Sequence, residues 1–361
     1  MHRLCLLLLL ALLIPSLAAA DRVTVKGTVL EGTVKAISAK EVVLKTVYGK
    51  GDLVIATDDV SAIETDAPFH VFQADDTLTV GNVVGVSPTA LAVAGADGAR
   101  HEIPFDKVQA APRDAGPAAN WLERQSVESP WWSGNVDLSF ASFDAATHTT
   151  ALATGFGVSR ERGPNRTRFG TSYLRSTTRD DEDDEDTTDV DESDEEVTGD
   201  ELRGFLRHEH DFTERWFGFG SVEAEHDGIE DLALRLIPKL GAGYKIVNTE
   251  TLLFSVDAGF AYVYQKYFGG DTESFPALAL GAESAWKLPW LGASWRTRLD
   301  YLPSLTDPIE DYRMRGETAL LIPIVEQLSF KAALIDEYNS QPADDAVANS
   351  LSTLLGLSLV Y

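Results

Sequence analysis

From Trp131 onward, the chain alternates apolar and polar residues with a period of two over long segments. In segment 231–246, Leu234, Leu236 and Leu240 share one parity, whereas Arg235 and Lys239 share the other. Successive side chains of a strand point to opposite faces, so this pattern predicts strands with one apolar and one polar face. We predict twelve such strands, at residues 131–143, 148–160, 165–177, 201–212, 215–226, 231–246, 250–267, 274–287, 292–302, 311–322, 327–338 and 350–361.

The connections between these segments alternate in length. Every second one is short, such as residues 161–164 and 213–214, whereas most of the others are long. Outer-membrane barrels have short periplasmic turns and longer extracellular loops, and they carry apolar residues outside and polar residues inside. A soluble β-sheet protein is the alternative, but it has no reason to alternate in this way. We therefore favour an all-β fold with a transmembrane antiparallel β-barrel over residues 131–361.

The last predicted strand shows which face meets lipid. Leu355, Leu357, Leu359 and Tyr361 lie on one parity and form an apolar row that ends in an aromatic residue. Such a row is typical of the strand that closes a membrane barrel, so we expect these side chains to face lipid.

Charged residues of the predicted strands fall mainly on the opposite parity and are lumen candidates. A charged constriction that selects solutes is one interpretation, and an ion-pair lattice that fills a narrow barrel is the other. The candidates are Arg203, Arg207, Arg235, Arg296, Arg298, Arg313, Arg315, Asp257, Asp300 and Glu317, with Lys239, Glu209 and Glu283 on the same faces.

Residues 21–113 contain an internal repeat. Gly32 and Gly49 recur as Gly81 and Gly98, in both cases with short β-rich runs between them. This predicts two small SH3-like or Sm-like β repeats, and the alternative is one irregular sandwich. Residues 114–130 carry Gly116, Pro117 and Pro130 and are predicted to be a linker with one or two helical turns.

Residues 1–20 have the features of a signal peptide. An apolar run follows His2 and Arg3, and small residues 18–20 offer a cleavage site before Asp21. The single cysteine, Cys5, lies inside that run, so a mature chain would have no disulfide or thiolate metal site. No later run is long enough for a transmembrane helix. We expect export to a bacterial outer membrane, with the membrane lipid and the barrel-assembly machinery as partners.

The net charge of −27 argues against nucleic acid as a partner, because phosphate binding requires clustered basic residues. The predicted acidic loop at 178–201 accounts for much of this charge, with fifteen acidic residues in 176–201. Clustered carboxylates can hold Ca²⁺ or Mg²⁺. The run lacks the spacing of a calcium loop, so we favour a solvated, self-repelling loop outside the barrel.

Catalytic motifs are weak in this sequence. His208 and His210 share one face of a predicted strand, but no glycine-flanked serine accompanies them. Two histidines near a strand end are more often interfacial residues than catalysts. We therefore predict no enzyme, no cofactor and no metal site, with an outer-membrane hydrolase as a minor alternative.

Three stretches resemble a known family. They are residues 132–138 (WSGNVDL), Arg235 followed by 241–244 (GAGY), and residues 257–260 (DAGF). They are similar to the salt-induced outer membrane protein family, domain of unknown function 481, over about residues 131–361. Two features depart from its pattern: residues 144–147 replace an expected Gly-Asn, and the acidic segment resembles an insertion. The resemblance implies an outer-membrane barrel, but it supplies no catalytic residues, because the activity of the family is itself uncharacterised.

The sequence therefore predicts an outer-membrane component of one of two kinds. The first is a narrow channel or structural envelope component. The second is a non-conducting barrel that anchors residues 21–113 near a periplasmic or cell-wall partner.

Overall fold

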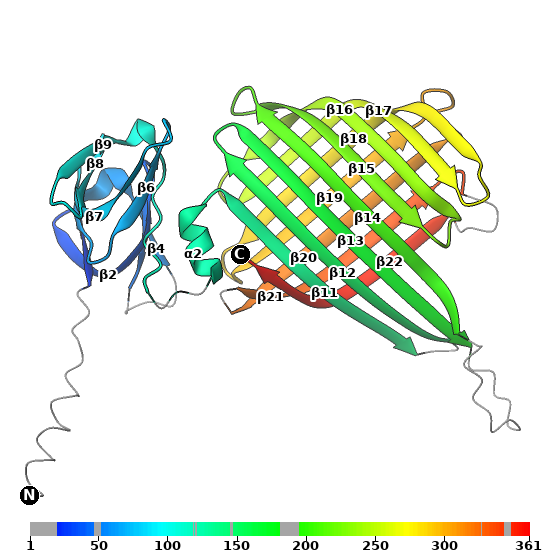
Figure 1. Ribbon diagram of the computed structural model, residues 1–361, viewed down its shortest axis with the longest axis horizontal. Helices are drawn as coiled ribbons and strands as arrows, with labels where there is room; N and C mark the ends of the chain where they lie inside the picture. Colours follow the sequence, from blue (N-terminus) through cyan, green and yellow to red (C-terminus); the bar gives the residue numbers. More distant parts are fainter. Residues whose placement is uncertain are drawn as a thin grey trace, which may run out of the picture. The chain divides into compact units, whose positions relative to one another are not determined.

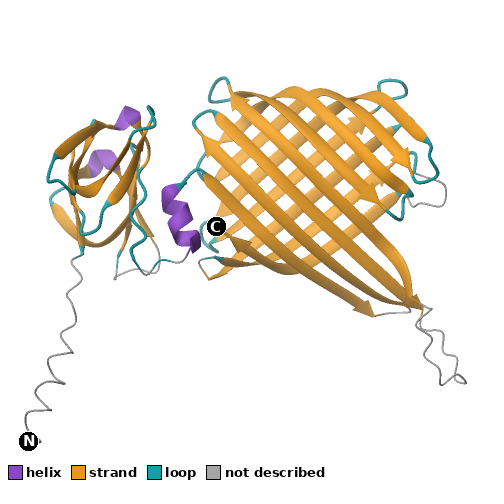
Figure 2. Ribbon diagram, in the orientation of Figure 1, coloured by secondary structure: helices purple, strands orange, loops and turns teal. Residues whose placement is uncertain are grey.

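The computed structural model describes residues 20–46, 52–117, 119, 121–144, 147–180, 195–325, 327–342 and 348–361. Residues 1–19 of the predicted signal peptide and the centre of the acidic loop, residues 181–194, lie outside these residues. The chain divides into two compact units, residues 1–130 and 131–361. Both consist almost entirely of strands (Figures 1 and 2). Within the described residues, no helix is both long enough and apolar enough to cross a membrane.

The first unit contains two five-stranded sheets with the same internal order. One sheet runs β4-β3-β2-β1-β5 and the other runs β9-β8-β7-β6-β10, so each strand of the first has a counterpart five strands later. Each repeat has a 3₁₀ turn before its last strand: η1 (Thr57–Asp59) and η2 (Phe105–Lys107). The predicted repeat is therefore confirmed. The strands are β1 (Asp21–Val25), β2 (Thr28–Ile37), β3 (Glu41–Lys45), β4 (Asp52–Ala56), β5 (Val60–Glu64), β6 (Phe69–Gln73), β7 (Leu78–Val86), β8 (Ala90–Gly95), β9 (Arg100–Pro104) and β10 (Val108–Ala110).

The recurring glycines Gly32 and Gly81 have the same steric role in both repeats. A Cβ atom on Gly32 would lie 2.4 Å from the Lys45 carbonyl oxygen, and one on Gly81 would lie 2.1 Å from that of Ala94. Neighbouring strands approach too closely there for any side chain. The strand register shifts just beyond both glycines, after Val34 in β2 and after Val83 in β7. The sequence repeat thus encodes a repeated strand bend.

The two sheets share one apolar core. Side chains from both repeats, among them Val23, Ile63, Phe69 and Leu91, are fully buried in a single cluster. Each sheet therefore covers one side of a common core. The domain has the two predicted repeats, and they pack together as the sandwich alternative predicts. An eight-residue helix, α2 (Trp121–Glu128), follows in the segment predicted to be the linker.

A buried carboxylate joins the first strand to the end of this domain. The Asp21 side chain is fully buried and accepts hydrogen bonds from the backbone N–H groups of Val34 and Asp66, both at 2.7 Å. Arg113 donates to the carboxylates of both Asp21 and Asp66. Burial raises the pKa of the Asp21 carboxyl. The charged form of Asp21 is therefore stabilised by these two backbone donors and by the Arg113 guanidinium.

The second unit is a closed barrel in which each strand pairs with the next and β22 pairs with β11. This confirms the twelve-stranded antiparallel fold. The strands are β11 (Trp132–Asp144), β12 (Thr147–Arg162), β13 (Asn165–Asp180), β14 (Glu195–Asp211), β15 (Trp216–Asp227), β16 (Leu232–Asn248), β17 (Leu252–Tyr267), β18 (Thr272–Leu288), β19 (Ala293–Pro303), β20 (Tyr312–Val325), β21 (Leu328–Asn339) and β22 (Asn349–Val360). We call the end where β11 begins and β22 ends the proximal end, and the opposite end the distal end.

The ladder between β13 and β14 extends into the predicted acidic loop. Thr177 pairs with Val197 and Thr178 with Glu196, so β14 begins six residues before the predicted strand. Threonine and valine favour strands, and their cross-strand pairs outweigh the charge pattern that indicated a loop. The connection at this site is therefore shorter than the acidic run suggests.

The outer surface of the barrel carries a belt of large apolar side chains. Residues of every second position are exposed, including Leu240 at 72%, Phe260 at 69% and Phe140 at 56%. An exposed apolar surface of this extent is unusual for a soluble protein and marks an interaction with lipid or protein.

We predict that Arg113→Met destabilises the first unit by about 3 kcal/mol, because it leaves the buried Asp21 carboxylate without its counter-charge. Hydrogen exchange of the Val34 amide in the full chain measures this loss. The control is Arg22→Met, since Arg22 and Glu31 form a solvent-exposed pair at 3.7 Å that contributes at most about 1 kcal/mol. Equal losses in both variants would contradict the proposed role of Arg113.

Candidate functional site: the charged barrel lumen

The strand register places the charged rows inside the barrel. Glu283 on β18 pairs with Arg298 on β19, which pairs with Glu317 on β20. Trp295 and Leu299, on the opposite parity of β19, are 46% and 55% exposed. Most charged strand residues therefore share one confined space, where they form two clusters.

The first, which we call the Arg168 cluster, joins five strands. Arg168 donates at 2.8 Å to both Glu283 and Glu209. Its other members are Arg207, Asp257, Arg298 and Asp300, and Asp257 accepts from both Arg207 and Arg298, at 3.3 and 3.2 Å. Arg207 also lies 4.0 Å from the centre of the Phe219 ring, which stabilises the cation further.

The second, which we call the Glu225 cluster, is centred on one buried carboxylate. The Glu225 side chain is 6% exposed and lies within 3.3 Å of three guanidinium groups, those of Arg203, Arg235 and Arg313. Arg203 also contacts Glu201 and Glu337, both at 2.7 Å. Arg315 completes the cluster through Glu337.

Three of these ion pairs cross the lumen. They are Arg168–Glu283, Arg203–Glu337 and Arg313–Glu225, and they join β13 to β18, β14 to β21 and β20 to β15. In each case the two strands are five positions apart in the closed order of twelve, nearly opposite each other. Side chains therefore meet across the barrel at both clusters.

Part of the lumen remains accessible to water. Phe205 faces inward, because its β14 neighbours Arg203 and Arg207 do, yet it is 42% exposed. A large aromatic side chain in a filled interior would be buried. An open chamber therefore lies beside Phe205.

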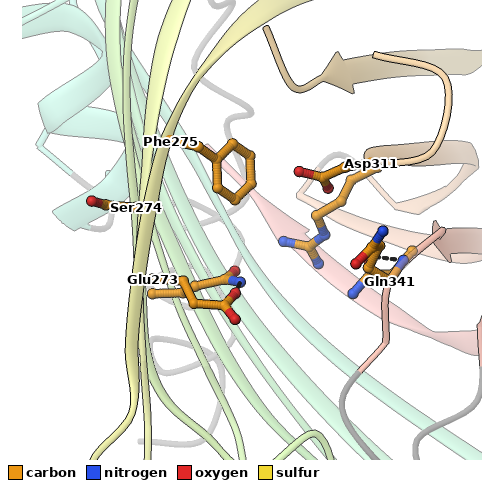
Figure 3. Close-up of a pocket in the computed structure, with 8 residues that line it drawn as sticks. Glu273, Ser274, Phe275, Asp311 and Gln341 are labelled. Carbon is orange, nitrogen blue, oxygen red and sulfur yellow. Dashed lines mark hydrogen bonds between the residues drawn. The ribbon is translucent and has the colours of Figure 1, made fainter. Parts of the chain in front are cut away.

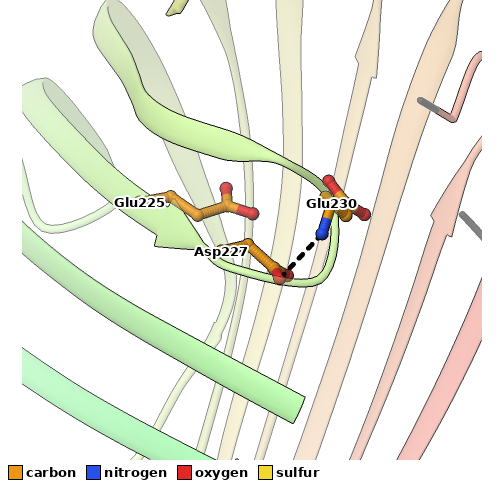
Figure 4. A group of neighbouring side chains, drawn as sticks. All are labelled: Glu225, Asp227 and Glu230. Atoms are coloured by element: carbon orange, nitrogen blue, oxygen red, sulfur yellow. Dashed lines mark hydrogen bonds between the residues drawn. The ribbon is translucent and has the colours of Figure 1, made fainter. Parts of the chain in front are cut away.

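Glu225, Asp227 and Glu230 form a compact carboxylate group near the turn after β15 (Figure 4). Their closest oxygens lie within 4.8 Å of one another. Burial raises the pKa of Glu230, which lies in the turn. Because three arginines already neutralise Glu225, this group is an ion-pair centre rather than a cation site.

A polar cavity of about 280 Å³ opens near the distal end. Phe275, Asp311 and Gln341 face it from three different segments, as Figure 3 shows. Several of its polar groups already have partners: Gln265 donates to Glu273 within the lining at 2.7 Å, and Arg313 donates to Glu225 outside the lining.

Nine of the ten lumen candidates belong to these networks. Arg203, Arg207, Arg235, Arg298, Arg313, Arg315, Asp257, Asp300 and Glu317 each have an ion pair within 4.0 Å. Arg296 shares the inward parity of Arg298, but it is exposed and pairs across the strands with Ala285 and Ala319.

The sequence pattern did not single out Arg168, Glu225 and Glu337 as lumen residues. Arg168 alternates with the outward Phe169, so its parity was a usable signal. The alternation along β15 did not identify Glu225, because two aromatic residues of this strand, Phe217 and Phe219, face inward and are 4% and 3% exposed. On that strand, large apolar residues lie on both faces, because Trp216 and Val222 on the other parity are 54% and 41% exposed.

The closing strand has the orientation that its sequence predicts. Leu355, Leu357 and Leu359 are 49%, 45% and 41% exposed, whereas Ser358 on the other parity is fully buried. The Tyr361 ring lies over Gly134, where a Cβ atom would come within 2.4 Å of it. Gly134 therefore makes room for the last aromatic side chain.

His208 and His210 lie on the outer face at the proximal end. His208 bonds Thr167 and His210 bonds Asn165, both at 2.9 Å. Neither histidine contacts a serine hydroxyl or a carboxylate among the interactions of the described chain.

A model of a protein family, described as "Protein of unknown function, DUF481", matches residues 136–361. This is well over half of the chain and the whole barrel except its first few residues. The chain belongs to this family. Among curated proteins, none matches the sequence closely enough to count as a relative.

Solved barrels resemble this family member only distantly. The NanC porin is 9% identical, with a TM-score of 0.39, and the match covers 63% of this chain and 98% of the porin. An outer membrane channel from Pseudomonas putida F1 is 10% identical, with a TM-score of 0.37 and coverages of 64% and 95%. The translocator domain of the autotransporter NalP from Neisseria meningitidis is 12% identical, with a TM-score of 0.34 and coverages of 63% and 87%. These similarities are too distant to carry a functional argument.

The contact across the lumen can be measured in this DUF481 barrel by a double-mutant cycle. We predict that Arg168→Gln and Glu283→Gln couple by about 1–3 kcal/mol in unfolding free energy, because the two groups touch directly. Urea unfolding of the refolded full chain, followed by tryptophan fluorescence, provides the four values. The control cycle pairs Arg168→Gln with Glu273→Gln, which shares no partner with Arg168. Coupling of the same size in both cycles would contradict a direct contact.

Proposed function

We propose that this chain is an outer-membrane β-barrel that spans the bilayer as a closed structural component. On this proposal it holds residues 21–113 on the periplasmic side, where they are available to an envelope partner. The observation that carries the proposal is the set of ion pairs that meet across the lumen. Arginine and glutamate side chains from nearly opposite strands interlock at two clusters, and such pairs obstruct the passage of solutes.

The membrane location rests on the outer surface. The exposed apolar belt suits the hydrocarbon core of a bilayer, and closure of the sheet leaves no strand edge unpaired, as a membrane barrel requires. Both ends of the barrel unit lie at the proximal end, where each connection between strands has at most four residues, whereas the longest connections lie at the distal end. Short turns face the periplasm in known barrels, so this orientation directs the first unit to that compartment.

A narrow channel is the second candidate, and Phe205 favours it. This inward ring is 42% exposed, so part of the lumen holds water. If the accessible space continued past both clusters, small solutes could pass.

The membrane location predicts a depth-dependent cost of charge on the outer face. Leu355→Arg, near the middle of β22, should destabilise the barrel by about 2–4 kcal/mol in lipid vesicles. Leu351→Arg, on the same face near the distal end, should cost about 0–1 kcal/mol. Urea unfolding midpoints in vesicles distinguish the two. Similar small costs at both positions would show that the belt does not face lipid.

The closed lumen predicts no stepwise current when the refolded full chain is inserted into a planar bilayer in potassium chloride. The same recording without residues 21–113 tests whether the barrel alone conducts. Steady single-channel steps in the wild type, increased by Phe205→Ala because the chamber widens, would overturn closure and support the narrow channel.

A further inference from the structure

Basic and hydrogen-bond-donating side chains form an unusual outward strip at the proximal end. Arg160 on β12 pairs across the strands with Trp132 on β11 and Thr167 on β13, and Thr167 pairs with His208 on β14. One step nearer the strand ends, Arg162 pairs with Asn165, which pairs with His210. We call these six residues the proximal strip: Arg160, Arg162, Asn165, Thr167, His208 and His210.

The strip lies on the outside of the barrel rather than in the lumen. His208 and His210 are exposed, whereas their neighbours Arg207 and Glu209 on the opposite parity are 7% and 5% exposed inside. Thr167 likewise alternates with the inward Arg168. The side chains of the strip therefore lie on one part of the outer wall, on β12, β13 and β14, near the proximal end of these strands.

Two tryptophans hold the arginines at this level. The Arg162 guanidinium carbon lies 4.7 Å from the centre of the Trp131 ring, and that of Arg160 lies 5.9 Å from the centre of the Trp132 ring. Tryptophan is enriched at the boundary between lipid and water, and arginine extends its charged group toward the headgroups there. These contacts suit a cation held at the depth of lipid phosphates.

The charge of the strip contrasts with the rest of the chain. The chain has a net charge of −27. Yet on the outward parity of β11–β14 at the proximal end, the described residues include no carboxylate. The strand acids Glu161 and Asp211 have the inward parity and are paired, Glu161 with Arg166 at 2.8 Å and Asp211 with Lys245 at 2.5 Å. An anion at the strip would therefore meet the donors and the positive charge of these outward side chains.

We propose that the proximal strip binds the phosphate group of anionic phospholipids in the adjacent leaflet. The guanidinium groups of Arg160 and Arg162 would contact the phosphate oxygens. The Thr167 hydroxyl and the Asn165 amide would supply further hydrogen bonds. The two tryptophans pack beside the upper acyl chains. This inference rests on the proposed membrane location and adds to it a lipid preference on one side of the barrel.

The test measures the affinity of the detergent-solubilised full chain for dioleoylphosphatidylglycerol by native mass spectrometry, with dioleoylphosphatidylcholine as the zwitterionic comparison. We expect the wild type to prefer the anionic lipid. The double variant Arg160→Gln/Arg162→Gln should bind it roughly 30-fold more weakly, since each cation near an anionic headgroup contributes about 1 kcal/mol.

The control variant is Arg175→Gln/Lys266→Gln. Both residues face outward near the distal end, on β13 and β17, so this variant removes the same charge from the opposite side of the barrel. We expect its affinity to stay within about twofold of the wild type, because screening limits the reach of a surface charge to about 10 Å. Equal losses in the two variants, or no anionic preference in the wild type, would overturn the lipid site.

A separate measurement distinguishes this inference from the membrane location on which it rests. The wild type is refolded into vesicles of dioleoylphosphatidylcholine alone, and insertion is followed by heat-modifiable mobility on a gel. Failure to insert there would overturn the membrane proposal itself. Insertion without a phosphatidylglycerol preference would overturn only the strip as a lipid site. An unchanged lipid affinity in the double variant would overturn it too, and would leave a protein partner as the ligand of the strip.

Discussion

A closed antiparallel sheet sends every second side chain into one confined space, and this constraint shapes the whole barrel. The outer surface must be apolar if it meets lipid, so charged residues of the strands accumulate inside. Charges removed from water are costly unless each finds a partner. Arg168 therefore reaches Glu283 across the lumen at 2.8 Å, and Glu225 collects three arginines. The ion-pair clusters are a consequence of closure as much as a device for function.

The sequence predicted the barrel well because period two is a strong signal on most strands. On β19, Trp295 and Leu299 alternate with Arg296 and Arg298, and the structure assigns those parities as expected. The repeat in the first unit could be predicted for a different reason: Gly32 and Gly81 recur in the sequence because the same close approach of two strands recurs in the structure. In both cases one local steric or solvation rule repeats along the chain, so the resulting pattern is visible in a single sequence.

Contacts across the lumen could not be predicted from the same signal. The alternation along each strand predicts that Arg203 and Glu337 face inward. Nothing in this local pattern indicates that strands β14 and β21 lie nearly opposite each other. That relation depends on the number of strands and on closure. Glu225 was missed for a second reason, since the inward Phe219 packs under the Arg207 guanidinium. An aromatic residue that stabilises a cation inside a barrel breaks the rule that aromatics point to lipid.

The same constraint explains why the outward charges are informative. A charge inside the lumen can be neutralised by residues from any strand, so its presence says little about the surroundings of the barrel. A charge on the outer face has only its nearest neighbours and the medium. Arg160 and Arg162 lie outside at the proximal end, with tryptophan rings beneath them and donors beside them. On the proposed membrane location, such a position suits the boundary of the lipid core, where water and anionic headgroups are present. The outer charges thus indicate the depth of the barrel in a membrane, which the interior charges cannot do.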